Sequence, residues 1–227
     1  MKKTLGAIVA MACFALMSAV ASAATVSYGP VNIGPSPTGA SGSFGLQQFD
    51  PSLGTLTQVD LYVTGNSDGG SNGLQNLSEF DGSATVTIGS DITVSGPASL
   101  TVLTFPNNSN TGPVAPYTGA IDFTFSGPDS VLVNGIPSVD SDNSSIFVGL
   151  APYIGLSTVN FNYGSVANTS ANANVSPTFS ATTAPTFGFE ASVTYHYTPV
   201  PEPTTLALAG LGALGLAVAV RRKRIAG

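Results

Sequence analysis

The chain carries no lysine or arginine between Ala24 and Val220. This long interior also lacks methionine, and Glu79 and Glu190 are its only glutamates ahead of the C-terminal segment. Because Lys, Arg, Met and Glu are the side chains that favour exposed helices, a helical domain is disfavoured. The interior is rich in Gly, Ser, Thr, Asn, Val and Phe, which are typical of strands and turns. The composition therefore predicts an all-β fold.

Alternation of apolar and polar residues supports this prediction. It is longest at residues 187–197 and recurs at residues 57–63, 84–88, 121–125 and 159–163. One apolar face and one polar face per strand is typical of an antiparallel sheet. Many such strands separated by Gly, Pro and Asn turns are typical of a β-sandwich. We therefore expect residues 24–198 to form one antiparallel β-sandwich, long enough to enclose a core.

Turns are expected where glycine, proline and asparagine gather. The segments concerned are residues 65–70, 96–97, 127–129 and 134–135. Residues 106–116, bounded by two prolines, are expected to form a long exposed loop. Residues 168–180 are low in complexity and fit either a polar edge strand or a loose loop.

The N-terminus reads as an export signal. Lys2 and Lys3 precede an apolar run, and Ala21-Ser22-Ala23 supplies small residues at a cleavage site. We expect residues 1–23 to be a signal peptide that signal peptidase removes between Ala23 and Ala24. An uncleaved anchor and a lipoprotein signal at Cys13 are alternatives that fit less well. Cys13 is the only cysteine, so the predicted mature chain has no disulfide.

The C-terminus has three parts. Residues 199–205 form a proline-rich spacer, residues 206–220 contain no polar side chain, and residues 221–227 are basic. The apolar part predicts a single hydrophobic helix at the lower limit of a membrane span, roughly 17 residues with its two flanking threonines. The basic cluster predicts a membrane stop kept on the cytoplasmic side by Arg221, Arg222, Lys223 and Arg224.

This tail, with Pro201-Glu202-Pro203, an apolar run and a basic end, resembles the PEP-CTERM sorting signal of Gram-negative bacteria. The resemblance implies that an exosortase recognises Pro201, Glu202 and Pro203. It also implies a transient stay in the inner membrane, followed by release to the cell surface or extracellular matrix. An ordinary single-pass anchor with a proline-rich stalk is the alternative.

The interior resembles a second family. Residues 49–59 look like the opening motif of the choice-of-anchor E domain, and residues 164–169 and 191–197 are similar in character. The family offers no established catalytic or binding residue to transfer to this chain. The physical reading of the motif is structural, with Asp50-Pro51 opening a turn and Leu56 entering a strand.

Candidate catalytic groups are few. His196 is the only histidine, and a Ser-His-Asp triad would have to use it. No nucleophile motif accompanies it, so an exposed strand histidine is the favoured interpretation, and a zinc site lacks ligands. Glu79 with Asp81, or Glu190 with a distant aspartate, could supply paired carboxylates. Nothing in their spacing selects either pair.

Asp140, Asp142 and Ser144 have the alternating spacing of the first ligands of a calcium loop. However, Ser145 stands where that loop needs glycine, and Ala151 where it needs glutamate. A polar turn is therefore the favoured interpretation. We expect no metal and no other cofactor.

The charge pattern limits the partners. Without lysine or arginine the interior cannot neutralise phosphates, which excludes nucleic acid as an expected partner. We expect a non-enzymatic protein with a structural or interaction role, and the tail resemblance implies an association with exopolysaccharide and biofilm. A carbohydrate-binding module that uses tyrosines and calcium is the alternative. A glycan-active hydrolase is the least favoured class.

Overall fold

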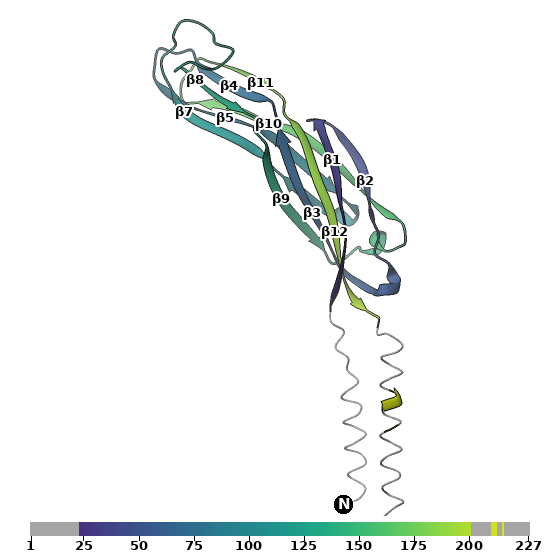
Figure 1. The fold of residues 1–227 in the computed structure, drawn as a ribbon. Helices are drawn as coiled ribbons and strands as arrows, with labels where there is room; N and C mark the ends of the chain where they lie inside the picture. The colour runs from purple at the N-terminus through teal and green to yellow at the C-terminus, as the bar shows by residue number, and fades with distance from the viewer. Residues whose placement is uncertain (1–22, 201–209, 213–214, 216–227) are drawn as a thin grey trace, which may run out of the picture. The chain divides into compact units, whose positions relative to one another are not determined.

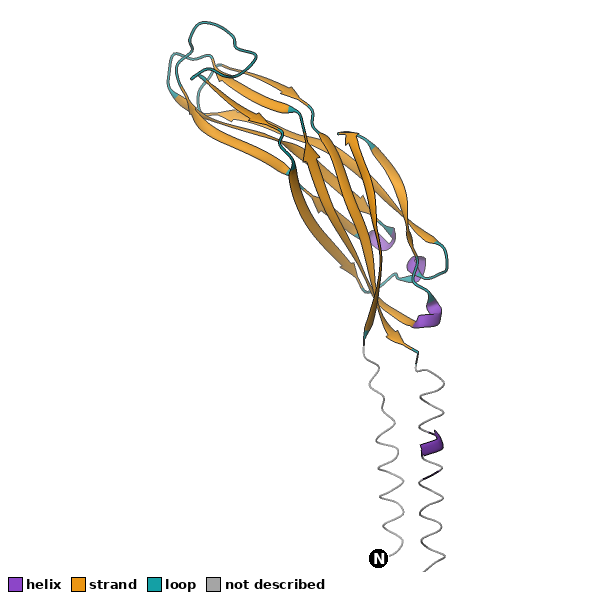
Figure 2. Cartoon of the chain, in the orientation of Figure 1, coloured by secondary structure: helices purple, strands orange, loops and turns teal. Residues whose placement is uncertain are grey.

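The computed structural model describes residues 23–200, 210–212 and 215 (Figures 1 and 2). Within these residues the fold is all-β with antiparallel sheets, as the composition predicts. The strands are β1 Ala24–Pro37, β2 Ser41–Gln47, β3 Gly54–Asp68, β4 Ser71–Asn76, β5 Gly82–Ser95, β6 Thr101–Thr104, β7 Asn107–Val114, β8 Ser130–Asn134, β9 Ser138–Ile146, β10 Thr158–Ala173, β11 Thr178–Thr183 and β12 Thr186–Pro199. Three short 3-10 helices interrupt them: η1 Pro51–Leu53, η2 Pro97–Ser99 and η3 Ala151–Tyr153.

The described residues fall into two compact units. Thr25–Asp50 and Leu56–His196 make up the larger one, and it contains almost all of the strands. Pro51–Thr55 and the segment that begins at Tyr197 belong to the other. Within that smaller unit the Val200 N–H donates to the Leu53 carbonyl at 3.2 Å.

The strands form three sheets. Their orders are β1-β12-β3-β9, β2-β10-β5-β6 with β7 also on β5, and β11-β4-β8. The long strands β5 and β10 pair from Asn162–Ser95 to Ala173–Ala84. One stretch of β5 packs on the sheet that contains β4 and β8 (Figure 1). Another stretch packs on β3, where Ile92 lies against Gly65. The layers therefore pack face to face as a sandwich.

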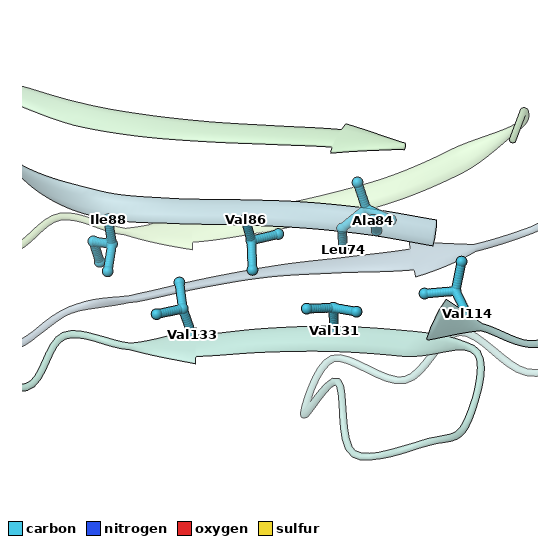
Figure 3. Close-up of a cluster of buried hydrophobic side chains, with 7 residues drawn as sticks. All are labelled: Leu74, Ala84, Val86, Ile88, Val114, Val131 and Val133. Atoms are coloured by element: carbon cyan, nitrogen blue, oxygen red, sulfur yellow. The ribbon is translucent and has the colours of Figure 1, made fainter. Parts of the chain in front are cut away.

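Two groups of side chains fill the space between the layers. Aliphatic residues from β4, β5, β7 and β8 meet in the cluster of Figure 3, namely Leu74, Ala84, Val86, Ile88, Val114, Val131 and Val133. The second group is aromatic. Phe189 of β12 lies 5.6 Å from Phe44 of β2 and 5.2 Å from Tyr163 of β10, measured between ring centroids. The alternation at residues 187–197 is confirmed, because Phe187, Phe189 and Tyr195 are all buried.

Two local predictions are wrong. Residues 106–116 do not form a loop, because β7 pairs with β5 through this segment. Hydroxyl pairs link the two strands on their exposed face, Thr85 with Thr111 at 2.9 Å and Thr87 with Ser109 at 3.2 Å. The sequence shows no alternating pattern for this strand, because Val114 is the only one of its residues that is buried.

The strand expected at residues 121–125 is also absent. Asp122 accepts hydrogen bonds from Thr124 Oγ1 at 2.6 Å and from the Ser126 N–H at 2.9 Å. These bonds fold the segment into turns, since a short carboxylate side chain competes with the sheet for backbone donors. The two phenylalanines of this segment differ in burial. Phe125, which has a positive φ of 50°, is buried, and Phe123 is exposed.

Two expectations remain, one for residues 168–180 and one for the C-terminal hydrophobic helix. Of residues 168–180, the first part continues β10 and the last part begins β11, an edge strand of its sheet. The hydrophobic helix expected at 206–220 lies outside the described residues, apart from residues 210–212 and 215, which are helical. Among the described residues, none belongs to a helix with the length and apolar character needed to cross a membrane.

Candidate functional site

The predicted sorting residues fall mostly beyond the described part of the chain. Pro201, Glu202 and Pro203 lie outside it, as do Arg221, Arg222, Lys223 and Arg224. Ala23 is described and exposed, and Ala24 is the first residue of β1. The predicted signal peptidase cut between them therefore falls at the start of the first strand.

The only histidine is paired with a buried carboxylate. His196 Nε2 on β12 lies 2.7 Å from Asp60 Oδ2 on β3, and Asp60 is only 4% exposed. Gln58 Nε2 donates to the other carboxylate oxygen of Asp60 at 2.6 Å. The sequence places His196 on a polar face but cannot supply this partner, which stands far away along the chain. Within residues 24–200, His196 is the only side chain able to carry a positive charge.

This pair does not have the order of a catalytic triad. Ser145 stands opposite Asp60 in the β3–β9 ladder and hydrogen-bonds the carboxylate of Asp60. The carboxylate therefore lies between serine and imidazole, whereas a triad requires the imidazole between serine and carboxylate. The serine is not activated in this arrangement, and the group ties three strands together across the sheet.

The environment of Asp60 makes the fold sensitive to acid. Burial raises the pKa of Asp60, but hydrogen bonds from Ser145, Gln58 and His196 outweigh it and hold the pKa below its ordinary value of 3.8. A carboxyl with a depressed folded-state pKa stabilises the fold fully well above that value. That contribution is lost as the pH falls below 3.8 toward the folded-state pKa.

We predict that Asp60→Asn lowers the free energy of unfolding at neutral pH by about 1–3 kcal/mol, because hydrogen bonds to a charged group are lost. Between neutral pH and about pH 3, the stability of the variant should also fall less than that of the wild type. Urea unfolding at both pH values measures this. Asp142→Asn is the control, since Asp142 is exposed on β9 and accepts only the neighbouring Asn143 N–H. An Asp60→Asn curve that matches the wild type at neutral pH contradicts the prediction.

The calcium candidates lie on a strand and not in a turn. Asp140, Asp142 and Ser144 are spaced along β9 and pair with Gly65, Val63 and Leu61 of β3. Asp140 already accepts the Phe105 N–H at 2.8 Å. Extended backbone cannot wrap ligands around one ion as a calcium loop does. Within the described part of the chain, no three His, Cys, Asp or Glu side chains gather as a metal site would need.

A groove of about 410 Å³ lies over the sheet that contains β2, β10, β5 and β6. Gly164 forms an open floor, since no atom lies within 4 Å of the position a Cβ would take. Leu103, Phe105 and Val166 line the groove as exposed apolar side chains. Asp91 adds a carboxylate, whose Oδ1 accepts Asn168 Nδ2 at 2.7 Å. The volume lies in the lower range of small-molecule sites.

The other candidate groups do not line this groove. Glu79 and Asp81 are exposed in the segment between β4 and β5, and Glu190 is exposed on β12. No tyrosine lines the groove, and Tyr153 and Tyr195 are fully buried, which raises the pKa of both. The tyrosines that a carbohydrate-binding module would use therefore include core residues.

A buried polar network holds the segment between β7 and β8. Gln75, Asn76 and Asp129 are each at most 1% exposed. Asn76 Nδ2 donates to the carbonyls of Phe80 and Ala115, both at 2.7 Å, and its Oδ1 accepts the Ser78 N–H at 2.8 Å. Sequence reasoning missed this network, because isolated Gln, Asn and Asp residues give no periodic signal.

Comparison with known proteins identifies the tail. The model of the PEP-CTERM protein-sorting motif matches residues 199–223. No curated protein matches the chain. Among solved structures, that of Desmodium yellow mottle tymovirus is 8% identical, covers 80% of this chain and 86% of its own, and has a TM-score of 0.18.

Two further virus structures are comparable. The mud crab tombus-like virus chain is 10% identical, with coverage of 80% and 86% and a TM-score of 0.20. The infectious bursal disease virus Gx strain chain is 13% identical, with coverage of 81% and 44% and a TM-score of 0.20. These scores are too low to transfer a fold or a role. The C-terminal segment of this chain is thus a PEP-CTERM protein-sorting motif, which points to export and to processing by an exosortase.

Proposed function

We propose that this chain is an exported protein that reaches the cell surface or extracellular matrix of a Gram-negative bacterium through exosortase sorting. The PEP-CTERM motif at residues 199–223 is the observation that carries the proposal. The signal peptide at residues 1–23 directs export. The apolar run at 206–220 and the basic residues 221–227 then hold the chain transiently in the inner membrane.

In the matrix the β-sandwich serves a structural or interaction role linked to exopolysaccharide, and it is not an enzyme. The order serine–carboxylate–imidazole at Ser145, Asp60 and His196 supports this, since it is not the order of a catalytic triad. A body without lysine or arginine suits uncharged, hydrated polymers and not phosphate-bearing ones. The likeness of residues 49–59 to a choice-of-anchor E domain fits the same role.

The groove favours carbohydrate binding as a second candidate function. Phe105 offers an apolar surface for a sugar ring, and Asp91 offers hydrogen-bond acceptors beside it. A glycan array of neutral oligosaccharides with the wild type and Phe105→Ala tests this, with and without EDTA for the calcium-assisted form. Binding that Phe105→Ala leaves unchanged places the ligand elsewhere.

The sorting role is tested in a host that has an exosortase. Replacing Pro201, Glu202 and Pro203 by alanine removes the recognition element but leaves the apolar run, so insertion should continue and release should stop. Full-length protein should accumulate in the inner membrane, detected by fractionation and immunoblotting. Replacing the four basic residues by neutral ones is the contrasting variant, expected to weaken retention and orientation.

If the alanine variant is trimmed and released like the wild type, Pro201, Glu202 and Pro203 are not the recognition element and the sorting role is wrong. Such a result does not affect the carbohydrate-binding hypothesis, because the glycan array tests the β-sandwich and not the C-terminal tail.

A further inference from the structure

Gln75, Thr118 and Asp129 bring an amide, a hydroxyl and a carboxylate to one point. Gln75 lies near the end of β4, and its side chain is buried with 0% exposed. Asp129 is 1% exposed. Thr118 belongs to the exposed segment between β7 and β8. Thr118 Oγ1 and Gln75 Nε2 each lie 3.0 Å from the same atom, Asp129 Oδ2. The Thr118 N–H also points to that oxygen, at 3.2 Å.

This shared oxygen has the place of a proton shuttle. In acyl transfer, one group takes the proton of the attacking hydroxyl and then gives it to the leaving nitrogen. Asp129 Oδ2 contacts both of those atoms. Burial raises the pKa of Asp129, but hydrogen bonds from Gln75 and Thr118 outweigh it, so the pKa stays below its ordinary value. The carboxylate is therefore ionised at neutral pH, the form that can accept a proton.

The carbonyl of Gln75 is also held as an acyl-transfer centre needs. Its Oε1 accepts the backbone N–H of Asp122 at 2.9 Å, and such a donor stabilises negative charge that develops on the oxygen. Nε2 donates its other hydrogen to the Ala120 carbonyl at 2.9 Å, which fixes the plane of the amide.

We propose that Thr118 and Gln75 join as an ester that cross-links the β7–β8 segment to β4. Thr118 Oγ1 bonds to Gln75 Cδ while its proton passes to Asp129. The Cδ–Nε2 bond then breaks, Asp129 returns the proton to the nitrogen, and ammonia leaves. The reaction consumes one hydroxyl and one carboxamide, yields one ester and one ammonia, and needs no oxidant or added reagent.

The composition of the chain fits a cross-link of this kind. The predicted mature body contains no cysteine for a disulfide and no lysine for an amide cross-link between side chains. A hydroxyl and a carboxamide are one of the pairs that remain. A bond across the base of the segment would restrict its opening, as a closed loop does. This inference goes beyond the proposed sorting role and does not depend on it.

Intact-mass measurement of the exported protein tests the inference. The wild type should weigh less than its sequence by one ammonia, and hydroxylamine should open the ester to a hydroxamate on Gln75, which raises the mass by one hydroxylamine. Because the body has no tryptic site, chymotryptic and peptic digests should be used. They should contain one peptide pair in which Gln75 and Thr118 are joined.

Thr118→Val should remove both the deficit and the joined peptide, and it should fold because Thr118 is exposed. Asp129→Asn should do the same, since the shuttle is lost. Thr111→Val is the matched control. Thr111 is also exposed, and its Oγ1 pairs with the Thr85 hydroxyl at 2.9 Å, so the deficit should persist. A wild type of full sequence mass, or a deficit that maps to a succinimide at Asn134-Gly135, overturns the inference.

Discussion

Phe189→Ala is expected to lower the free energy of unfolding by about 3–5 kcal/mol, the cost typical of removing a buried phenylalanine ring. Phe189 is 1% exposed, and its ring touches Phe44 and Tyr163 of the opposite sheet. The substitution removes apolar burial and leaves a cavity between the two layers. Since single domains are stable by only about 5–15 kcal/mol, this is a large share of the total.

Urea unfolding of the exported protein, followed by circular dichroism, measures the change. Phe80→Ala is the matched control, because Phe80 is 73% exposed and its truncation should alter stability by at most about 0.5 kcal/mol. Equal midpoints for the two variants would show that the layers do not meet at Phe189, and the sandwich described above would be wrong there.

Asn76→Ala should have the next largest effect, a loss of about 2–4 kcal/mol, since a fully buried side chain loses several hydrogen bonds at once. The carbonyls of Phe80 and Ala115 and the Ser78 N–H all depend on this one side chain. Amide hydrogen exchange should rise in the segments after β4 and β7 before it rises elsewhere.

Asn110→Ala is the control for this prediction. Asn110 Nδ2 also donates to a backbone carbonyl, that of Leu132 at 2.7 Å, but the side chain is exposed and water can replace the bond. Its loss should stay below about 1 kcal/mol. Similar losses for both variants contradict a special role for the buried network.

The sequence predicts strands well where burial alternates and poorly where it does not. Residues 187–197 alternate because β12 lies inside a sheet with one face on the core. β7 and β9 carry mostly polar residues on exposed surface, so nothing in their pattern separates them from loops. Residues 121–125 show the opposite failure, since a side chain that binds backbone donors overrides an alternating pattern.

The candidate sites were less predictable than the strands. Asp60 and His196 meet because β3 and β12 are neighbours in a sheet, and only the strand order reveals that. The same holds for Gln75 with Asp129, and for Asp91 with the apolar side chains of its groove. The sorting motif is different, because a processing enzyme reads it as a linear segment and the sequence alone identifies it.

The C-terminal residue of the wild-type protein tests the central claim most directly. It should be determined by intact mass in two hosts that differ only in the presence of an exosortase. With the enzyme, the protein should be released and should lack residues 206–227, having been cut near Pro201-Glu202-Pro203. Without it, the protein should remain in the membrane fraction and end at Gly227. The same C-terminal residue in both hosts would contradict exosortase sorting.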